Sequence, residues 1–215
     1  MTRSFNERLE LFRKSDIYPV VTSAFCNGRS VTEVLSGIAA GGAKIVQIRE
    51  KSMSDNAMFQ LLAECKKITD KFNMLLIVDD RVDLAMAIGA DGVHLGQDDF
   101  PLAEAVKLAP EMLFGCSTHN ADEIAKAQLD NCSYLNIGPV FPTQTKSVPC
   151  GALGPETVQK LKTDVRCPFS VMGGIKEHHL SSLIQNNFRH IAMVTEITSA
   201  PDVEQKVKQL RKYWN

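Results

Sequence analysis

The chain has little of what attaches a protein to nucleic acid or to a membrane. Lysine and arginine number 24 against 25 aspartates and glutamates, so the formal net charge is −1 and no overall field attracts a polyanion. No apolar run has the roughly 20 residues of a membrane-spanning helix. The polar N-terminus, MTRSFNER, lacks the apolar core of a secretory signal. We therefore expect small-molecule partners, no nucleic-acid or membrane partner, and a cytoplasmic location.

Cysteine is also sparse. The 6 cysteines include no C-x-x-C pair, and their scatter fits neither a metal site nor a disulfide framework. Free thiols in a reducing compartment are expected instead. Hydrophobic residues make up 44% of the 215, which is enough for one sizeable core and too little for two comfortable domains. Residues 1–215 are therefore predicted to form a single domain.

Short apolar runs alternate with longer amphipathic segments along the whole chain. The amphipathic segments repeat apolar residues every three or four positions, as in a helix with one buried face. The short runs predict eight strands, at residues 18–22, 44–49, 75–78, 92–95, 113–117, 134–138, 169–172 and 191–194. Alternating strands and helices are typical of a parallel sheet.

Polar residues follow nearly every predicted strand. An open parallel sheet gathers its ligand groups in one crevice, whereas a closed barrel gathers them around a whole rim. We therefore predict an α/β fold of the (β/α)8 TIM-barrel type. A leading segment at residues 5–14 is expected to form a short helix that caps the bottom of the barrel.

Cations follow two of the predicted strands. Arg49 and Lys51 come directly after the second strand, and Lys146 lies in the loop after the sixth. Arginine offers phosphate a planar fork and lysine a point charge, so cations converging on one rim indicate a multiply charged anion such as a diphosphate. Ordinary surface exposure is the alternative. Arg49 stands at a strand terminus, which in a barrel faces the site, so we favour anion binding over surface exposure for Arg49. For Lys146, which lies in a loop, both interpretations stay open.

Four aspartates, Asp79, Asp80, Asp98 and Asp99, follow the third and fourth strands. Carboxylate oxygens at adjacent strand ends suit Mg2+, which bridges to substrate phosphates. Aspartate also caps helices at strand-to-helix turns, and spacing alone does not choose between the two roles. We favour Asp80 and Asp99 as metal ligands.

Glycine and threonine residues indicate a second anion site. Gly173 and Gly174 follow the seventh strand and Thr195 follows the eighth, where many barrels bind a phosphate. Glycine exposes backbone N–H groups and permits a close approach. Thr143 and Thr145 offer hydroxyl donors, although ordinary turn chemistry also accounts for them.

Tyr18, Gln47 and His94 lie within predicted strands. Each can pack against a flat heterocycle or hydrogen-bond to it, whereas a purely structural role is the alternative, above all for a single histidine.

Taken in order, these motifs resemble the thiamine-phosphate synthase family. The resemblance extends from residue 18 to about residue 202 and is carried by residues 47–51, 79–85, 94–99, 115–117, 138–146 and 173–175. It implies a (β/α)8 barrel that joins hydroxymethylpyrimidine diphosphate to a thiazole phosphate and releases diphosphate. In that family the bond to diphosphate breaks first, and the thiazole nitrogen captures the resulting cation. Such chemistry needs neutralised charge and aligned rings more than acid–base groups.

The resemblance also implies a role for each matching residue. The diphosphate-binding and catalytic positions correspond to Arg49, Lys51, Ser117 and Lys146. The Mg2+ ligands correspond to Asp80 and Asp99. The pyrimidine contacts correspond to Tyr18, Gln47 and His94. The contacts to the thiazole and its phosphate correspond to Thr143, Thr145, Gly174, Val194 and Thr195.

Two positions depart from the family pattern. Asp79 stands where the family has an asparagine that contacts diphosphate. Like charges at about 4 Å cost roughly 1 to 4 kcal/mol, so Asp79 is expected to join the metal shell or to turn away. Residues 194–197 read Val-Thr-Glu-Ile where the family has Val-Ser-Ala-Ile. Glu196 would be unfavourable beside a phosphate unless it points to solvent.

Three other functions are compatible with parts of the pattern. A thiazole tautomerase on the same barrel would move a proton, with His119 as the candidate, but would not need Arg49, Lys51 and Lys146. A non-catalytic sensor of thiamine intermediates would need ligand groups without the metal and cation set. A sugar-phosphate epimerase would need acid–base pairs on opposing strands. The sequence leaves a homo-oligomer open.

Overall fold

The computed structural model describes residues 3–143, 145 and 151–214. Eight parallel strands form a closed barrel in which each strand pairs with the next and β8 pairs with β1. The strands are β1 Ile17–Val21, β2 Ile45–Ile48, β3 Leu75–Asp79, β4 Gly92–Leu95, β5 Leu113–Thr118, β6 Tyr134–Ile137, β7 Phe169–Val171 and β8 His190–Met193. The predicted (β/α)8 barrel is confirmed, and each predicted strand end agrees to within one residue.

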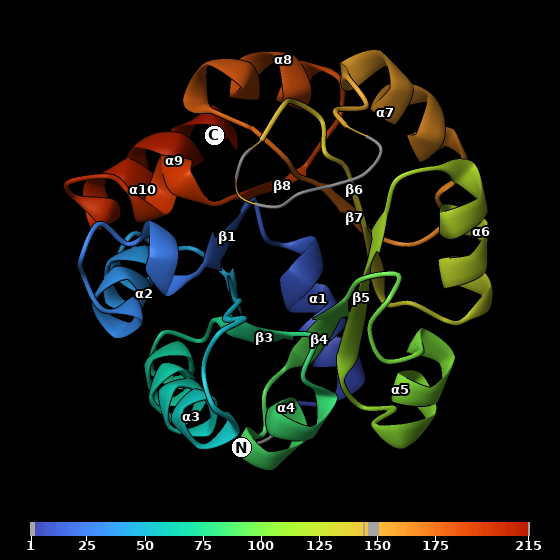
Figure 1. Ribbon diagram of the computed structural model, residues 1–215. Coiled ribbons are helices and arrows are strands. Elements are labelled where there is room, and N and C mark those ends of the chain that lie inside the picture. Colours follow the sequence, from blue (N-terminus) through green and yellow to red (C-terminus); the bar gives the residue numbers. More distant parts are fainter. Residues whose placement is uncertain (1–2, 144, 146–150, 215) are drawn as a thin grey trace.

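Helices surround the barrel, and Figure 1 shows them as an outer ring with α1 lying across the centre. They are α1 Phe5–Arg13, α2 Val31–Ala40, α3 Asp55–Lys71, α4 Val82–Ile88, α5 Leu102–Leu108, α6 Ala121–Leu129, α7 Pro155–Leu161, α8 Leu180–Gln185, α9 Thr195–Thr198 and α10 Val203–Arg211. Several begin at side-chain caps: Ser30, for example, accepts a hydrogen bond from the Glu33 N–H at the start of α2. Among residues 3–143, 145 and 151–214, no helix has both the length and the apolarity to span a bilayer.

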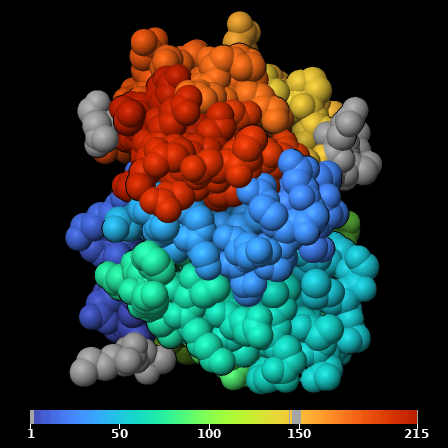
Figure 2. Space-filling model, turned by 90° about the vertical axis from the view of Figure 1, so that its left-hand side faces the viewer, coloured from blue at the N-terminus to red at the C-terminus, as the bar shows by residue number. Residues whose placement is uncertain are grey.

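The outer ring of helices closes where α10 packs against α2. A Cβ atom at Gly41, which directly follows α2, would lie 2.5 Å from the Val207 side chain of α10, and one at Gly37 within α2 would lie 3.0 Å from Val203. Glycine is therefore required for this close approach. Figure 2 shows the resulting face, with α10 in red lying against α2 in blue.

The lower half of the barrel interior is filled by side chains. Phe12 of α1 enters from below and stacks on Tyr134 with 4.4 Å between ring centroids. Both residues are fully buried, together with Tyr18 and Leu75. This packing leaves open space only toward the carboxyl ends of the strands.

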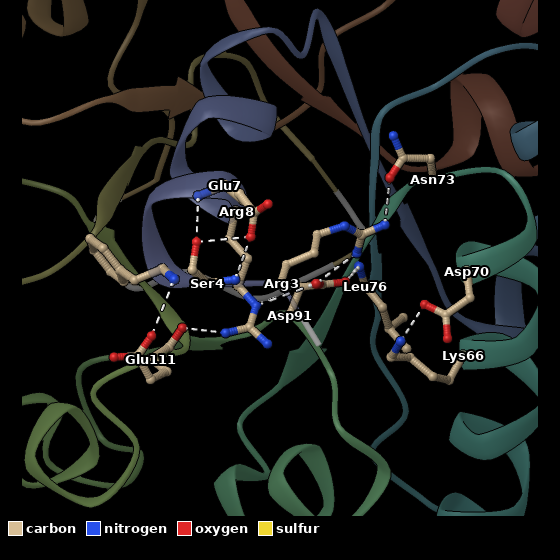
Figure 3. Close-up of polar contacts among 11 residues, drawn as sticks. Arg3, Ser4, Glu7, Arg8, Lys66, Asp70, Asn73, Leu76, Asp91 and Glu111 are labelled. Carbon is tan, nitrogen blue, oxygen red and sulfur yellow. Dashed lines mark hydrogen bonds and ion pairs between the residues drawn. The ribbon is translucent and has the colours of Figure 1, made fainter. Parts of the chain in front are cut away.

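A buried ion pair fixes α1 to the amino-terminal side of the barrel, as Figure 3 shows. Asp91, directly before β4, accepts hydrogen bonds from Arg3 at 2.7 Å and from Arg8 at 3.4 Å. Its second oxygen accepts from the Leu76 N–H at 3.0 Å. Arg8 also donates to the Glu111 carbonyl oxygen, just before β5. The expected capping helix is thus present at the bottom of the barrel.

Candidate active site

A pocket of about 950 Å3, counting its open mouth, lies at the carboxyl ends of the strands. Its size is within the range of small-molecule sites. The sequence-predicted residues that line it are Gln47, Arg49, Asp79, His94, Ser117, Thr143, Thr145, Gly174, Val194 and Thr195. Tyr18, Lys51, Asp80 and Asp99 do not line it. Lys146 lies outside the described residues.

A chain of hydrogen bonds runs beneath the pocket floor and accounts for the position of Tyr18. Gln47 Nε2 donates to Tyr18 Oη at 3.3 Å, and the Tyr18 and Tyr134 hydroxyls are 2.8 Å apart. Tyr134 Oη lies 3.3 Å from His94 Nδ1, and His94 Nε2 lies 2.9 Å from Ser117 Oγ. Burial raises the pKa of both tyrosines, so their hydroxyls stay protonated. Tyr18 therefore supports Gln47 from below rather than facing the pocket.

The cations after β2 and the carboxylates after β3 form a cluster at the rim. Arg49 Nε lies 3.4 Å from Asp79 Oδ2, and Lys51 Nζ lies 3.1 Å from the same oxygen. Lys51 also pairs with Asp80. Asp79 has thus turned toward both cations, and its charge is balanced by groups that are expected to bind diphosphate.

This pairing predicts the effect of Asp79→Asn. Removing the charge frees Arg49 and Lys51 for the substrate, so KM for the pyrimidine diphosphate should fall about 5-fold, which corresponds to roughly 1 kcal/mol for charges 4 Å apart in water. Steady-state kinetics at saturating thiazole phosphate would measure the change. A severe loss of turnover would instead identify Asp79 as a metal ligand.

The aspartates after β3 and β4 do not cap the helices that follow them, which contradicts the helix-cap alternative. Helix α4 begins after Arg81 and α5 after Pro101, and neither helix start has a side-chain cap hydrogen bond. Asp80 has a left-handed backbone with φ of 59° and pairs with Lys51. Asp99 Oδ2 accepts from the Gly96 N–H at 2.7 Å within its own loop.

The oxygen donors of Asp80 and Asp99 are of the kind that Mg2+ prefers, with substrate and water as the remaining ligands. Asp80 and Asp99 are hard oxygen donors at the ends of neighbouring strands, and the Lys51 ammonium already lies between Asp79 and Asp80, where a cation is favoured. Within the described part of the chain, no three His, Cys, Asp or Glu side chains are grouped to hold a metal by themselves.

The opposite side of the pocket is built from the loops after β6, β7 and β8. A Cβ atom at Gly174 would overlap the Pro142 carbonyl oxygen, and its φ of 62° also favours glycine. Phe141 N–H donates to the Gly173 carbonyl at 3.0 Å, which holds the two loops together. The Thr143 and Thr145 hydroxyls are 2.9 Å apart beside them. Backbone and hydroxyl groups thus converge on this wall.

Glu196 does not point to solvent, contrary to the condition that the sequence sets for a glutamate beside a phosphate. Its side chain is 14% exposed and lies 2.7 Å from Lys206 and 3.6 Å from Lys176. Two lysines therefore neutralise it.

Sequence reasoning assigned no role to the polar pocket residues Asn136 and Lys176, and it gave His119 only a minor one. Asn136 is 2% exposed and donates to Met172 Sδ at 3.0 Å, while its Oδ1 has no partner among the described residues. Alternation along β6 from the inward-facing Tyr134 would have identified it. Lys176 lines the pocket two residues after Gly174. His119 also lines it, with Nδ1 held 2.8 Å from Glu123.

Comparison with known proteins agrees with this geometry. The family model described as thiamine monophosphate synthase matches residues 17–197. The thiamine-phosphate synthase of Caldicellulosiruptor saccharolyticus is 39% identical over 211 residues, covering 98% of this chain and 96% of the relative. That of Lawsonia intracellularis is 36% identical over 199 residues, covering 92% of each.

The fold is also similar to that of a solved structure. The thiamine phosphate pyrophosphorylase of Pyrococcus furiosus superimposes with a TM-score of 0.86 at 29% identity, covering 94% of this chain and 96% of the other. A 3-hexulose-6-phosphate synthase, at 17% identity and a TM-score of 0.68, shares the fold alone. The family model and the nearly full-length relatives together show that the chain belongs to the thiamine monophosphate synthase family.

Proposed function

We propose that this protein joins a pyrimidinylmethyl diphosphate to a thiazole monophosphate, giving thiamine phosphate and diphosphate. The observation that carries the proposal is one pocket with a cation on one side and a glycine loop and a threonine on the other. Arg49 stands at the end of β2, and the Gly173–Gly174 loop and Thr195 lie on the opposite wall. Between them, Gln47, His94 and Ser117 form a polar floor suited to a flat heterocycle.

The chemistry asks the protein to stabilise a leaving group and to align two rings. When the carbon–oxygen bond breaks, its electron pair goes to the diphosphate, whose added charge Arg49, Lys51 and Ser117 would stabilise. Asp80 and Asp99 would hold Mg2+, which would supply further positive charge for the leaving diphosphate. Lys146, which lies outside the described residues, is proposed to act on the same group. No proton has to leave a carbon atom, which agrees with a floor of hydrogen-bonding groups that contains no carboxylate base.

The pyrimidine is proposed to bind against Gln47 and His94, with Tyr18 supporting both through the buried hydrogen-bond chain. The thiazole phosphate is proposed to bind at Thr143, Thr145, Gly174, Val194 and Thr195. The unpartnered Asn136 Oδ1 would accept from an N–H group of one substrate. We further propose a cytoplasmic enzyme acting as one domain over residues 1–215.

Diphosphate release tests this function against the tautomerase and sensor alternatives. Purified protein with Mg2+ should release one diphosphate per thiamine phosphate formed, and only when both substrates are present. Isomerisation of thiazole phosphate alone, without diphosphate release, would establish the tautomerase. Binding without any turnover would establish the sensor.

A further inference from the structure

Lys176 is a pocket cation to which the sequence patterns assigned no role. It follows β7 directly after Gly173, Gly174 and Ile175, and its Nζ donates to Thr195 Oγ1 at 3.0 Å. Loops after the seventh and eighth strands are where barrels commonly bind phosphate. The ammonium therefore lies on the wall where a phosphate is expected, joined to a hydroxyl from the neighbouring loop.

The partners of Lys176 leave it available for a ligand. Glu196 is its carboxylate neighbour, but the 3.6 Å separation is longer than the 2.7 Å between Glu196 and Lys206. The Lys176 side chain is also 42% exposed, compared with 20% for Lys206. Lys206 therefore makes the tighter pair and Lys176 the looser one.

Lys206 is itself fixed between two carboxylates. It lies 2.9 Å from Glu177 as well as 2.7 Å from Glu196. Burial opposes its charge, but the hydrogen bonds that Lys206 donates to Glu196 and Glu177 outweigh burial and raise the pKa of Lys206. Gln209 donates to Glu177 at 2.7 Å from the next turn of α10. Glu196 is thus held from the α10 side by an ammonium that is itself firmly placed.

We propose that Lys176 binds the monoester phosphate of the second substrate, and that Lys206 holds Glu196 so that this carboxylate does not take Lys176 from the phosphate. The inference rests on the proposed function and adds a formal cation to a subsite otherwise made of backbone N–H and hydroxyl donors. It also explains how a glutamate can lie next to a phosphate site. Glu196 could compete with the phosphate for Lys176, but it pairs with Lys206 instead. Lysine suits the task because an ammonium binds phosphate as a point charge.

A substrate pair isolates the contribution of Lys176. Wild type and Lys176→Met, which keeps the side-chain length and removes the charge, are compared on thiazole phosphate and on the corresponding thiazole alcohol. KM for the phosphate should rise about 10- to 100-fold in the variant, the range for a lost hydrogen bond between charged groups. KM for the pyrimidine diphosphate and for the alcohol should stay within about twofold. Lys176→Arg should restore most of the loss.

Variants of Glu196 and Lys206 give a second test, because the proposal predicts the direction and the relative size of their effects on KM. Glu196→Gln should lower KM for thiazole phosphate, and Lys206→Met should raise it by less than Lys176→Met does, because Glu196 then turns to Lys176. Lys208→Met is the matched control, since Lys208 pairs with Glu204 on the same helix outside the pocket. It should leave KM unchanged.

Equal effects of Lys176→Met on phosphate and alcohol, or no effect on either, would overturn the proposal. Dissociation constants of both compounds, measured by calorimetry, test Lys176 even if the wild-type protein makes no thiamine phosphate. A phosphate-specific loss of affinity in that case would support the Lys176 site while the proposed reaction fails.

Discussion

Replacing Arg49 by alanine is expected to lower kcat/KM for the pyrimidine diphosphate by about 100- to 1,000-fold, the usual cost of removing one donor to a developing oxyanion. The guanidinium lines the pocket at the end of β2 and is only 23% exposed, so water replaces it poorly. Arg49→Lys should recover part of the loss, because lysine restores the charge without the planar fork. Steady-state kinetics on folded variants would measure both effects.

Part of that loss would come from Asp79, which Arg49 neutralises at 3.4 Å. The double variant Arg49→Ala with Asp79→Asn separates the two contributions. If uncompensated Asp79 charge dominates, the double variant should be clearly faster than Arg49→Ala alone. Turnover of Arg49→Ala within about twofold of wild type would remove Arg49 from the diphosphate site.

The largest expected effect on stability lies at the other end of the barrel. Asp91→Ala should lower the free energy of unfolding by about 3 to 5 kcal/mol, because it leaves a buried guanidinium without its partner. Asp91 is 2% exposed and Arg8 4% exposed, and the change also removes the acceptor for the Leu76 N–H. Urea titration of both proteins would measure the difference.

Asp70→Ala is the matched control, since the Lys66–Asp70 pair lies nearby in Figure 3 but Asp70 is 53% exposed. It should cost about 0.5 kcal/mol or less. If Asp91→Ala and Asp70→Ala lowered the free energy of unfolding equally, the buried contacts of Asp91 would contribute no more to stability than an exposed ion pair. Turnover of folded Asp91→Ala should be close to wild type, because the cluster lies opposite the pocket.

The barrel could be predicted from the sequence because both faces of a parallel strand are covered. Such strands appear as apolar runs, and β3 and β8 are examples. A closed barrel also carries its functional groups at strand ends, so Gln47 and Arg49 could be placed at the pocket from position alone, whereas Ser117 was placed there by the family resemblance.

The contacts beyond the strand ends could not be predicted in the same way. Periodicity gives the face on which Tyr18 lies but not its depth in the barrel, and this depth puts it under the floor. Lys51 leaves the strand and its long side chain reaches back to Asp79 and Asp80, a direction that no pattern encodes. The Glu196–Lys206 pair joins α9 to α10 and depends on how the helices pack.

The most direct test of the central claim is the formation of thiamine phosphate from the two purified substrates, followed by mass spectrometry with Mg2+ present and after its chelation. We predict product with Mg2+, loss of product on chelation and recovery when Mg2+ is added back. No product in the presence of Mg2+ and both substrates, from protein shown to be folded, would contradict the proposed function.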